Sequence, residues 1–239
     1  MESPIYVLLS QQDALQRQMD VTAQNIANVN TTGYKSNDIL FEDFLVKPDK
    51  KFTHHMVLDR ATIRNTTQGT FIKTDNPLDI AISGQGYFAV QTPQGTQYTR
   101  QGAFQMDAEG NIVTADGYPL LSGGGSTVAI PTSAQSVEIG LDGTISTEKG
   151  KVGRLQVVKF NNEQLMKQTY GGFYKTDEAP EIDETVQLHQ GKVESSNVKS
   201  IQEMTHVIEI SRAYERVARL IDGENQRLTN AIRSLGKVA

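Results

Sequence analysis

Cysteine and tryptophan are both absent from this chain of 239 residues. Without cysteine, the protein has no disulfide bond, no thiolate nucleophile, and no zinc or iron–sulfur site built on cysteine ligands. Long apolar runs are lacking as well, because the longest spans only Ile5 to Leu9, whereas a membrane-spanning helix needs about 20 apolar residues. The same short run, with no basic residue before it, does not make a secretory signal peptide. We therefore expect no membrane insertion and no cleaved signal.

Positive charge is also scarce. The chain has 23 Lys and Arg against 28 Asp and Glu, which gives a formal net charge of -5. Proteins that bind nucleic acid broadly depend on Lys and Arg to displace counterions from the phosphates, so the composition predicts no nucleic-acid partner. The length suits one large domain or two small ones, and either can bury a substantial core.

The N-terminal end carries a narrow apolar seam whose positions alternate three and four residues apart. Almost all residues between the seam positions are polar. The seam has two polar members, Gln12 and Thr22, and consists of Ile5, Leu8, Gln12, Leu15, Met19, Thr22, Ile26 and Val29. A repeat of 3.5 residues on so narrow a seam is typical of a coiled-coil helix. The run from Asn28 to Gly33 predicts the end of this helix, because Asn and Gly accept the left-handed conformation that closes helices.

The C-terminal end repeats this design. Its seam members again alternate three and four apart: Met204, Val207, Ser211, Tyr214, Ala218, Ile221, Asn225, Leu228, Ile232 and Leu235. Ser200 to Glu203 matches a capping box, with Asn197 as the alternative N-cap. A polar Asn225 on an apolar seam is a device that fixes coiled-coil register. The two ends therefore predict long helices that pair as a coiled coil; the alternative is that both helices pack on their own domain.

Glycine-based turns, two of them Asp-Gly pairs at Asp116-Gly117 and Asp142-Gly143, divide the middle of the chain into short segments. Strands at intervals of about 8–12 residues with such turns predict an antiparallel sheet or open barrel. The expected strands are Ala81 to Ser83, Tyr87 to Val90, Tyr98 to Arg100, Ala103 to Met106, Asn111 to Thr114, Val137 to Ile139, Thr144 to Ser146 and Leu155 to Phe160. The predicted fold class is thus α+β, with paired terminal helices and a central, mainly antiparallel β domain.

The segment of residues 36–69 gives no such pattern. Leu40 to Leu45 fits one helical turn or a strand equally well, and Pro48 to Lys51 is typical of a loop.

No group of side chains meets the requirements of a catalytic or metal site. The histidines His54, His55, His189 and His206 have no spacing that places two of them on one face of a helix or strand. Asp107 with Glu109, or Asp116 with Asp142, has the composition of a glycosidase pair. Each of these acids lies in or beside a turn, however, where Asp commonly bonds to the local backbone. The sequence therefore predicts no catalytic residue, no metal, no cofactor and no enzyme.

Long motifs spread over the whole chain resemble the flagellar axial proteins, the family of rod and hook subunits. They are Asn25 to Lys35, Gly84 to Val90, Tyr98 to Phe104, Gly110 to Tyr118 and Gln190 to Val198. Gln24 and Tyr34 depart from the Asn and Phe that are frequent in the family. The motif residues at the two ends are Asn25, Ala27, Asn28, Thr32, Gly33, Tyr34, Gly191, Glu194, Ser196, Asn197 and Val198.

The resemblance is strongest for the proximal-rod, F-type group, through Ile5-Tyr6-Val7 and the modest length. It implies a structural subunit with a coiled-coil helix at residues 1–35, a connecting segment at 36–75, a central β domain at 76–190 and a second coiled-coil helix at 191–239. The implied partners are copies of itself, other rod subunits and the flagellar export apparatus. The implied location is the periplasm-spanning rod. The implied assembly interface comprises Leu8, Leu15, Met19, Ile26, Val29, Met204, Val207, Tyr214, Ala218, Ile221, Asn225, Leu228, Ile232 and Leu235.

Other interpretations stay open at this point. The chain also fits a distal-rod subunit of the same family. From a different class, it fits a secreted β-domain protein that binds or cleaves peptidoglycan, with the helices as a dimerisation handle. A generic coiled-coil adaptor is the third alternative, and it would form a small closed oligomer.

Overall fold

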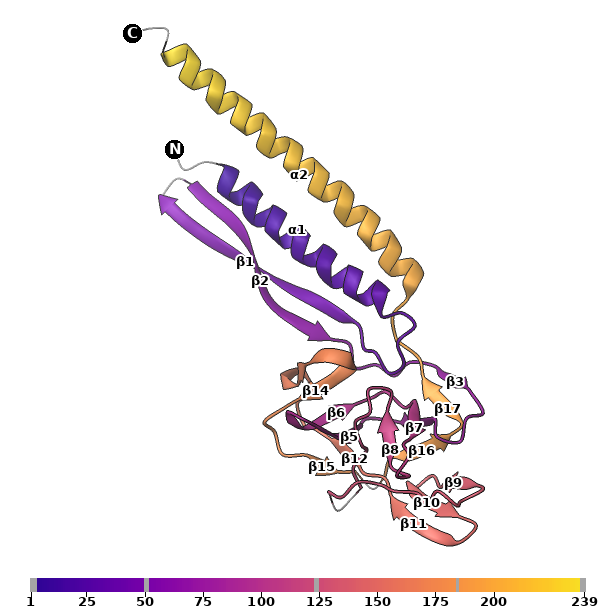
Figure 1. The fold of residues 1–239 in the computed structure, drawn as a ribbon. Helices are drawn as coiled ribbons and strands as arrows, with labels where there is room; N and C mark the ends of the chain where they lie inside the picture. Colours follow the sequence, from indigo (N-terminus) through magenta and orange to yellow (C-terminus); the bar gives the residue numbers. More distant parts are fainter. Residues whose placement is uncertain (1–3, 50–51, 123–124, 184, 237–239) are drawn as a thin grey trace. The chain divides into compact units, whose positions relative to one another are not determined.

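The computed structural model describes residues 4–49, 52–122, 125–183 and 185–236. Within these ranges the chain forms two compact units, each built from more than one stretch of sequence (Figure 1). We call residues 4–27, 37–65 and 198–236 the helical unit, and residues 28–36 and 66–197 the β unit. The chain therefore passes several times from one unit into the other.

Two helices and one hairpin make up the helical unit: α1 (Pro4–Ala27), α2 (Ser200–Leu235), β1 (Asn37–Asp49) and β2 (Phe52–Arg64). The strands pair antiparallel, with a register shift between Leu40 and Phe41. α1 packs against α2 and also against the hairpin, so it lies between them in Figure 1. The stretch from Leu40 to Leu45 is therefore strand, because a partner strand satisfies its backbone hydrogen bonds.

The two helices begin and end differently from one another. α1 stops at Ala27, and the Thr31 amide then donates to the Asn28 carbonyl at 3.1 Å. α2 begins at Ser200 after the N-cap residue Lys199, whose side chain makes no capping bond. Neither helix has both the length and the apolar character needed to cross a membrane, as far as the described residues extend.

The predicted N-cap of the C-terminal helix is wrong in both of its forms. Ser200 is already inside α2, so it does not cap. Asn197 is occupied elsewhere: its side-chain oxygen accepts from the Ser36 amide at 2.7 Å, and its Nδ2 donates to the Thr67 carbonyl at 3.0 Å. A side chain held in this way cannot also reach the first amides of the helix.

The β unit consists of short strands, and every strand pair in the described part of it is antiparallel. Its largest sheet has the order β13-β14-β6-β5-β12-β15. Short 3-10 turns at Glu163–Leu165 and Tyr170–Gly172 connect some of the strands. The strands are β3 (Phe71–Lys73), β4 (Ile80–Ser83), β5 (Tyr87–Thr92), β6 (Gly95–Thr99), β7 (Phe104–Met106), β8 (Ile112–Thr114), β9 (Val137–Ile139), β10 (Thr144–Thr147), β11 (Gly150–Arg154), β12 (Val157–Lys159), β13 (Lys167–Gln168), β14 (Phe173–Lys175), β15 (Glu181–Ile182), β16 (Gln187–Gln190) and β17 (Lys192–Glu194).

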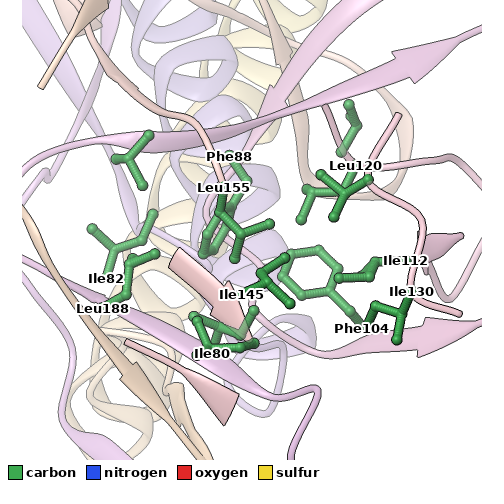
Figure 2. Packing of buried hydrophobic residues seen from close by; sticks show 14 of the residues in the cluster. Ile80, Ile82, Phe88, Phe104, Ile112, Leu120, Ile130, Ile145, Leu155 and Leu188 are labelled. Carbon is green, nitrogen blue, oxygen red and sulfur yellow. The ribbon is translucent and has the colours of Figure 1, made fainter. Parts of the chain in front are cut away.

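A dry core of aliphatic and aromatic side chains holds the β unit together. Ile80, Phe88, Ile112 and Ile145 are completely buried, at 0% exposed, and Figure 2 shows how they pack. The rings of Phe88 and Phe104 meet edge to face, with their centroids 5.1 Å apart. The α+β fold class is confirmed, with terminal helices that pack together and a mainly antiparallel β domain, whereas the coiled-coil pairing of the helices stays a prediction.

Candidate assembly surface

The buried residues of α2 form one stripe along the helix. Ile210 and Val217 are buried, at 3% and 4% exposed, and Val207, Tyr214 and Ile221 next to them are half-buried. Spacings of three and four residues put all five on the same face of a helix. Because α2 packs against α1, this is the face that α1 covers.

This covered stripe overlaps only partly with the seam read from the sequence. Val207, Tyr214 and Ile221 belong to both, whereas the seam has Ser211 and Ala218 where the covered stripe has Ile210 and Val217. A repeat of 3.5 residues drifts by about 20° per heptad around a straight helix, so the early seam members lie at the margin of the covered face. Met204 is accordingly 54% exposed.

The seam positions of α1 are all partly covered. Leu8, Leu15, Met19 and Ile26 are half-buried. The fully buried residues of this helix are Val21, Thr22 and Asn25. The last position of the predicted seam, Val29, follows the helix and belongs to the β unit, where it is half-buried. Coverage on two sides explains why the buried band of α1 is broader than a coiled-coil seam.

Part of the apolar stripe of α2 stays exposed in the part of the chain that the structure describes. α2 has 36 residues and α1 only 24, which makes α2 longer by about 18 Å at 1.5 Å per residue. In its last turns Leu228, Ile232 and Leu235 are 43%, 70% and 74% exposed, and the seam residue Asn225 is exposed too. We call these four residues the free stripe. By helical spacing it continues the face that α1 covers nearer the start of α2.

A groove lies between the two helices and reaches Arg227, next in sequence to Leu228 of the free stripe. Val7 and Leu8 of α1 form one side of it, and Leu220, Gly223 and Arg227 of α2 form part of the other. The guanidinium of Arg227 pairs with the Glu224 carboxylate at 2.8 Å, within the same helix. A shallow groove that is mostly apolar and lies beside an apolar stripe is suited to receive another helix.

The motif residues at the two ends of the chain are brought together inside the β unit. Glu194 is 1% exposed, and its carboxylate accepts from Lys35 Nζ at 2.6 Å, from Arg100 Nε at 2.8 Å and from the Gly69 amide at 2.8 Å. We call Lys35, Arg100 and Glu194 the Glu194 cluster. Burial lowers the pKa of Lys35 below its ordinary value of 10.5, and the nearby Glu194 carboxylate opposes that shift.

The rest of the motif fixes the backbone around this cluster. Gly33 has φ +67°, and a Cβ there would lie 2.4 Å from the Arg100 carbonyl oxygen, so the position favours glycine. Its amide donates to the Glu194 carbonyl at 2.8 Å. In the helical unit, the Asn25 side chain bonds to both the amide and the carbonyl of Asn37, each at 2.9 Å.

The remaining motif positions have smaller roles. Gly191 has φ +71° and its carbonyl accepts from the amides of Thr74 and Asp75. Asn28, Thr32, Ser196 and Val198 are half-buried, and Ala27 is exposed. Sequence reasoning overlooked Lys35 and Arg100 as partners of Glu194. The one available signal was that all three lie within or beside motif segments.

The acidic residues weighed as a catalytic pair serve turns instead. Asp107 accepts from the Asn111 side chain at 2.8 Å and from the Asn111 amide at 2.7 Å. Asp142 accepts from the hydroxyl and the amide of Thr144, at 2.7 and 3.1 Å. These hydrogen bonds, first of all those from the side chains of Asn111 and Thr144, hold the pKa of each carboxyl below its ordinary range.

The two histidines whose side chains the structure describes, His189 and His206, each contact a group that is not a metal ligand set. His206 Nε2 lies 3.3 Å from the amide nitrogen of the Gln18 side chain, and the ring of His189 contacts that of Phe71 at 5.6 Å between centroids. The side chains of His54 and His55 lie outside the described residues. Among those described, no group of three or more His, Cys, Asp or Glu side chains is placed to hold a metal ion.

Three family models match the chain in order. Residues 5–35 match the flagella basal body rod protein, residues 81–147 the D1 domain of the flagellar hook protein FlgE/F/G, and residues 189–234 the C-terminal region of the flagellar basal body rod FlgEFG protein. The first and third models contain the helices α1 and α2, and the middle one lies in the β unit.

Curated relatives match the chain over nine tenths of its length or more. The flagellar basal-body rod protein FlgF of Caulobacter vibrioides is 38% identical, with 100% of both chains covered. FlgF of Mesorhizobium japonicum is 33% identical, with 99% of both covered. FlgG of Buchnera aphidicola subsp. Schizaphis graminum is 32% identical, over 90% of this chain and 93% of the relative.

Proposed function

Because the chain belongs to the family of flagellar basal-body rod proteins and is a structural subunit of the rod, we propose that it is the proximal-rod subunit. The relatives named FlgF support this position, since they match the chain from end to end without added length. The FlgG relative covers less of the chain at similar identity. This comparison therefore gives less support to the alternative of a distal-rod subunit.

The subunit assembles through the surface of α2 that one copy leaves uncovered. This proposal is carried by the free stripe, whose three aliphatic residues are 43% to 74% exposed. Burying an aliphatic side chain of this size contributes roughly 1.5–3 kcal/mol, so a neighbour that covers the free stripe stabilises the assembly by several kcal/mol. When the surfaces that meet are different and the rotation between copies does not close, the product is an open helical array, as a rod requires.

A coiled coil formed between subunits is the arrangement that fits this surface best. The free stripe keeps the alternation of three and four residues, and Asn225 supplies the polar position that selects register. The exposed apolar residues Met204 and Ile208, at 54% and 52%, offer a second contact near the start of α2.

A charged residue in the free stripe tests this assembly. We expect Ile232→Asp to abolish incorporation into rods and motility, because the buried contact would have to accommodate a carboxylate. Ile232 is 70% exposed in the single chain, so the variant subunit itself should fold and melt like the wild type. Incorporation is measured by recovery of the subunit in purified basal bodies, and motility by swimming.

The matched control is Gln226→Asp, which adds the same charge to another exposed position of α2 on the opposite face by helical spacing. We expect it to assemble normally. Normal rods and swimming in the Ile232→Asp strain would overturn the proposed contact without affecting the membership of the family.

The position in the rod can be read directly by crosslinking. Because the chain has no cysteine, a single cysteine introduced at Leu235 gives crosslinks of unambiguous origin in intact basal bodies. Crosslinks to copies of itself and to both neighbouring rod proteins support the proximal position. Crosslinks to hook protein would indicate a distal subunit.

The subunit reaches the rod through the flagellar export apparatus as an unfolded chain that keeps its N-terminus. Long helices that depend on packing for their stability, and a chain without disulfides, are compatible with unfolding for passage. The test is the intact mass of the subunit recovered from basal bodies. A mass that lacks N-terminal residues beyond the initiating methionine would contradict export without cleavage.

A further inference from the structure

The Glu194 cluster lies near the points at which the chain enters and leaves the β unit. Two of the three donors to the Glu194 carboxylate are Lys35, at the end of the first stretch of the β unit, and the amide of Gly69, at the beginning of the second. Glu194 itself lies three residues before the chain leaves the unit at Asn197. Three segments that are distant in sequence, 33–36, 67–69 and 194–197, therefore converge on one buried carboxylate.

A layer of hydrogen bonds centred on Asn197 links the same three segments. Asn197 donates its backbone amide to the Tyr34 carbonyl at 3.3 Å, and its side-chain oxygen accepts from the Ser36 amide at 2.7 Å. Its side-chain nitrogen donates to the Thr67 carbonyl, to which Lys35 Nζ also donates at 2.8 Å. The cluster and this layer thus form one connected network, and loss of its central carboxylate affects every segment.

The charged groups at the centre of the network are buried, so we expect the network to form or open as a whole. Two cations, Lys35 and Arg100, share the single Glu194 carboxylate, and all three residues are at most 6% exposed. Arg100 uses its remaining donors on the carbonyls of Gly84 and Gly86 in the turn before β5. Removing one partner of a buried ion pair leaves an uncompensated charge, which is far more costly than losing an exposed pair.

We propose that the Glu194 cluster is a clasp: a cooperative closure that fastens the beginning and the end of the chain into the β unit, and that opens and closes as one element. Lys35 and Glu194 are 159 residues apart in sequence, so the clasp closes only when nearly the whole chain is available. The motif positions Gly33, Lys35, Glu194 and Asn197 therefore act inside the subunit, and this role is separate from the contacts between subunits proposed above.

Amide hydrogen exchange of the full chain tests the clasp. In Glu194→Gln we expect the amides of Gly33, Ser36, Gly69 and Asn197 to lose protection together, by about 100-fold or more. The amides of Ile80 and Ile112, which bond to carbonyls inside the β core, should keep theirs. The control is Glu148→Gln, since Glu148 is an exposed carboxylate outside the cluster that likewise accepts from backbone amides, those of Gln135 and Ser136.

Two results would overturn the proposal. Loss of protection at Gly69 alone would mean that the segments are held independently. An equal loss at the core amides would mean that Glu194 only contributes to global stability. If Glu194→Gln fails to fold, Lys35→Met carries the test, because it leaves the pair of Arg100 and Glu194 in place. A smaller loss spread over the same four amides then supports the clasp, and unchanged exchange contradicts it.

Discussion

At the scale of single residues, acidic side chains in this protein serve local geometry. Asp107 and Asp142 each accept bonds from residues two to four positions ahead, which is the role that turn chemistry assigns to Asp. The sequence predicts this role correctly because it depends on neighbours in the chain alone. The partner of Glu194 could not be found in the same way, because Lys35 and Arg100 are 159 and 94 residues away.

The turn carboxylates predict a loss of stability in acid. The pKa values of Asp107 and Asp142 are lower in the folded chain than their ordinary 3.8, so folding favours the ionised form. Their contribution is complete above about pH 5 and is lost as the pH falls through 3.8 toward the folded pKa. We expect the melting temperature to decline over this range, as measured by circular dichroism.

The double variant Asp107→Asn/Asp142→Asn isolates the effect. It removes both titrating groups, so its melting temperature should be lower at pH 7 and should fall less steeply in acid. An acid decline identical to that of the wild type would show that other carboxyl groups dominate.

At the scale of elements, local patterns predict strands and turns better than they predict packing. The Asp-Gly turns at Asp116-Gly117 and Asp142-Gly143 are confirmed, with φ +82° at both glycines, because a glycine supplies the needed backbone conformation by itself. The hairpin of β1 and β2 escaped prediction because only the pairing of its strands distinguishes it from a helical turn. Ile210 and Val217 escaped because a template with two positions per heptad excludes the wider stripe that a helix presents to a packed unit.

The covered stripe and the exposed face of α2 should respond differently to the same substitution. Ile210→Ala removes a side chain that is 3% exposed and should lower the free energy of unfolding by about 2–4 kcal/mol. Ile201→Ala truncates a side chain in the same helix that is 79% exposed and should change it by less than about 0.5 kcal/mol. Denaturant unfolding of both variants measures the difference, and equal effects would contradict the assignment of the covered face.

At the scale of the whole molecule, family motifs and structural units do not share boundaries. The N-terminal family model ends at residue 35, so it includes α1 from the helical unit and the segment of Gly33 and Lys35 from the β unit. We expect α1 to act in contacts between subunits, and the segment of Gly33 and Lys35 to act inside one subunit. A motif that is continuous in sequence therefore combines two physical tasks, which only the folded chain separates.

The division into two units predicts two melting steps. The large aromatic and aliphatic core lies in the β unit, whereas the helical unit leaves much of its apolar surface uncovered. We expect the helical signal at 222 nm to be lost at a lower temperature than the near-ultraviolet signal of the buried tyrosines, which include Tyr87 and Tyr174.

Variants in each unit check this assignment. Val217→Ala should lower only the first step, and Ile145→Ala, in the β core, only the second. Coincident transitions in all three proteins would show that the units unfold as one.

In the assembly proposed above, the unequal lengths of α1 and α2 give the polymer a polarity. Within the residues that the structure describes, the last turns of α2 extend beyond the length of α1 and keep their aliphatic side chains exposed. Each added subunit that covers the last turns of α2 on the preceding copy exposes the last turns of its own α2. Elongation is then self-perpetuating and one-directional, and it stops only when a different protein, lacking such an overhang, occupies the growing tip.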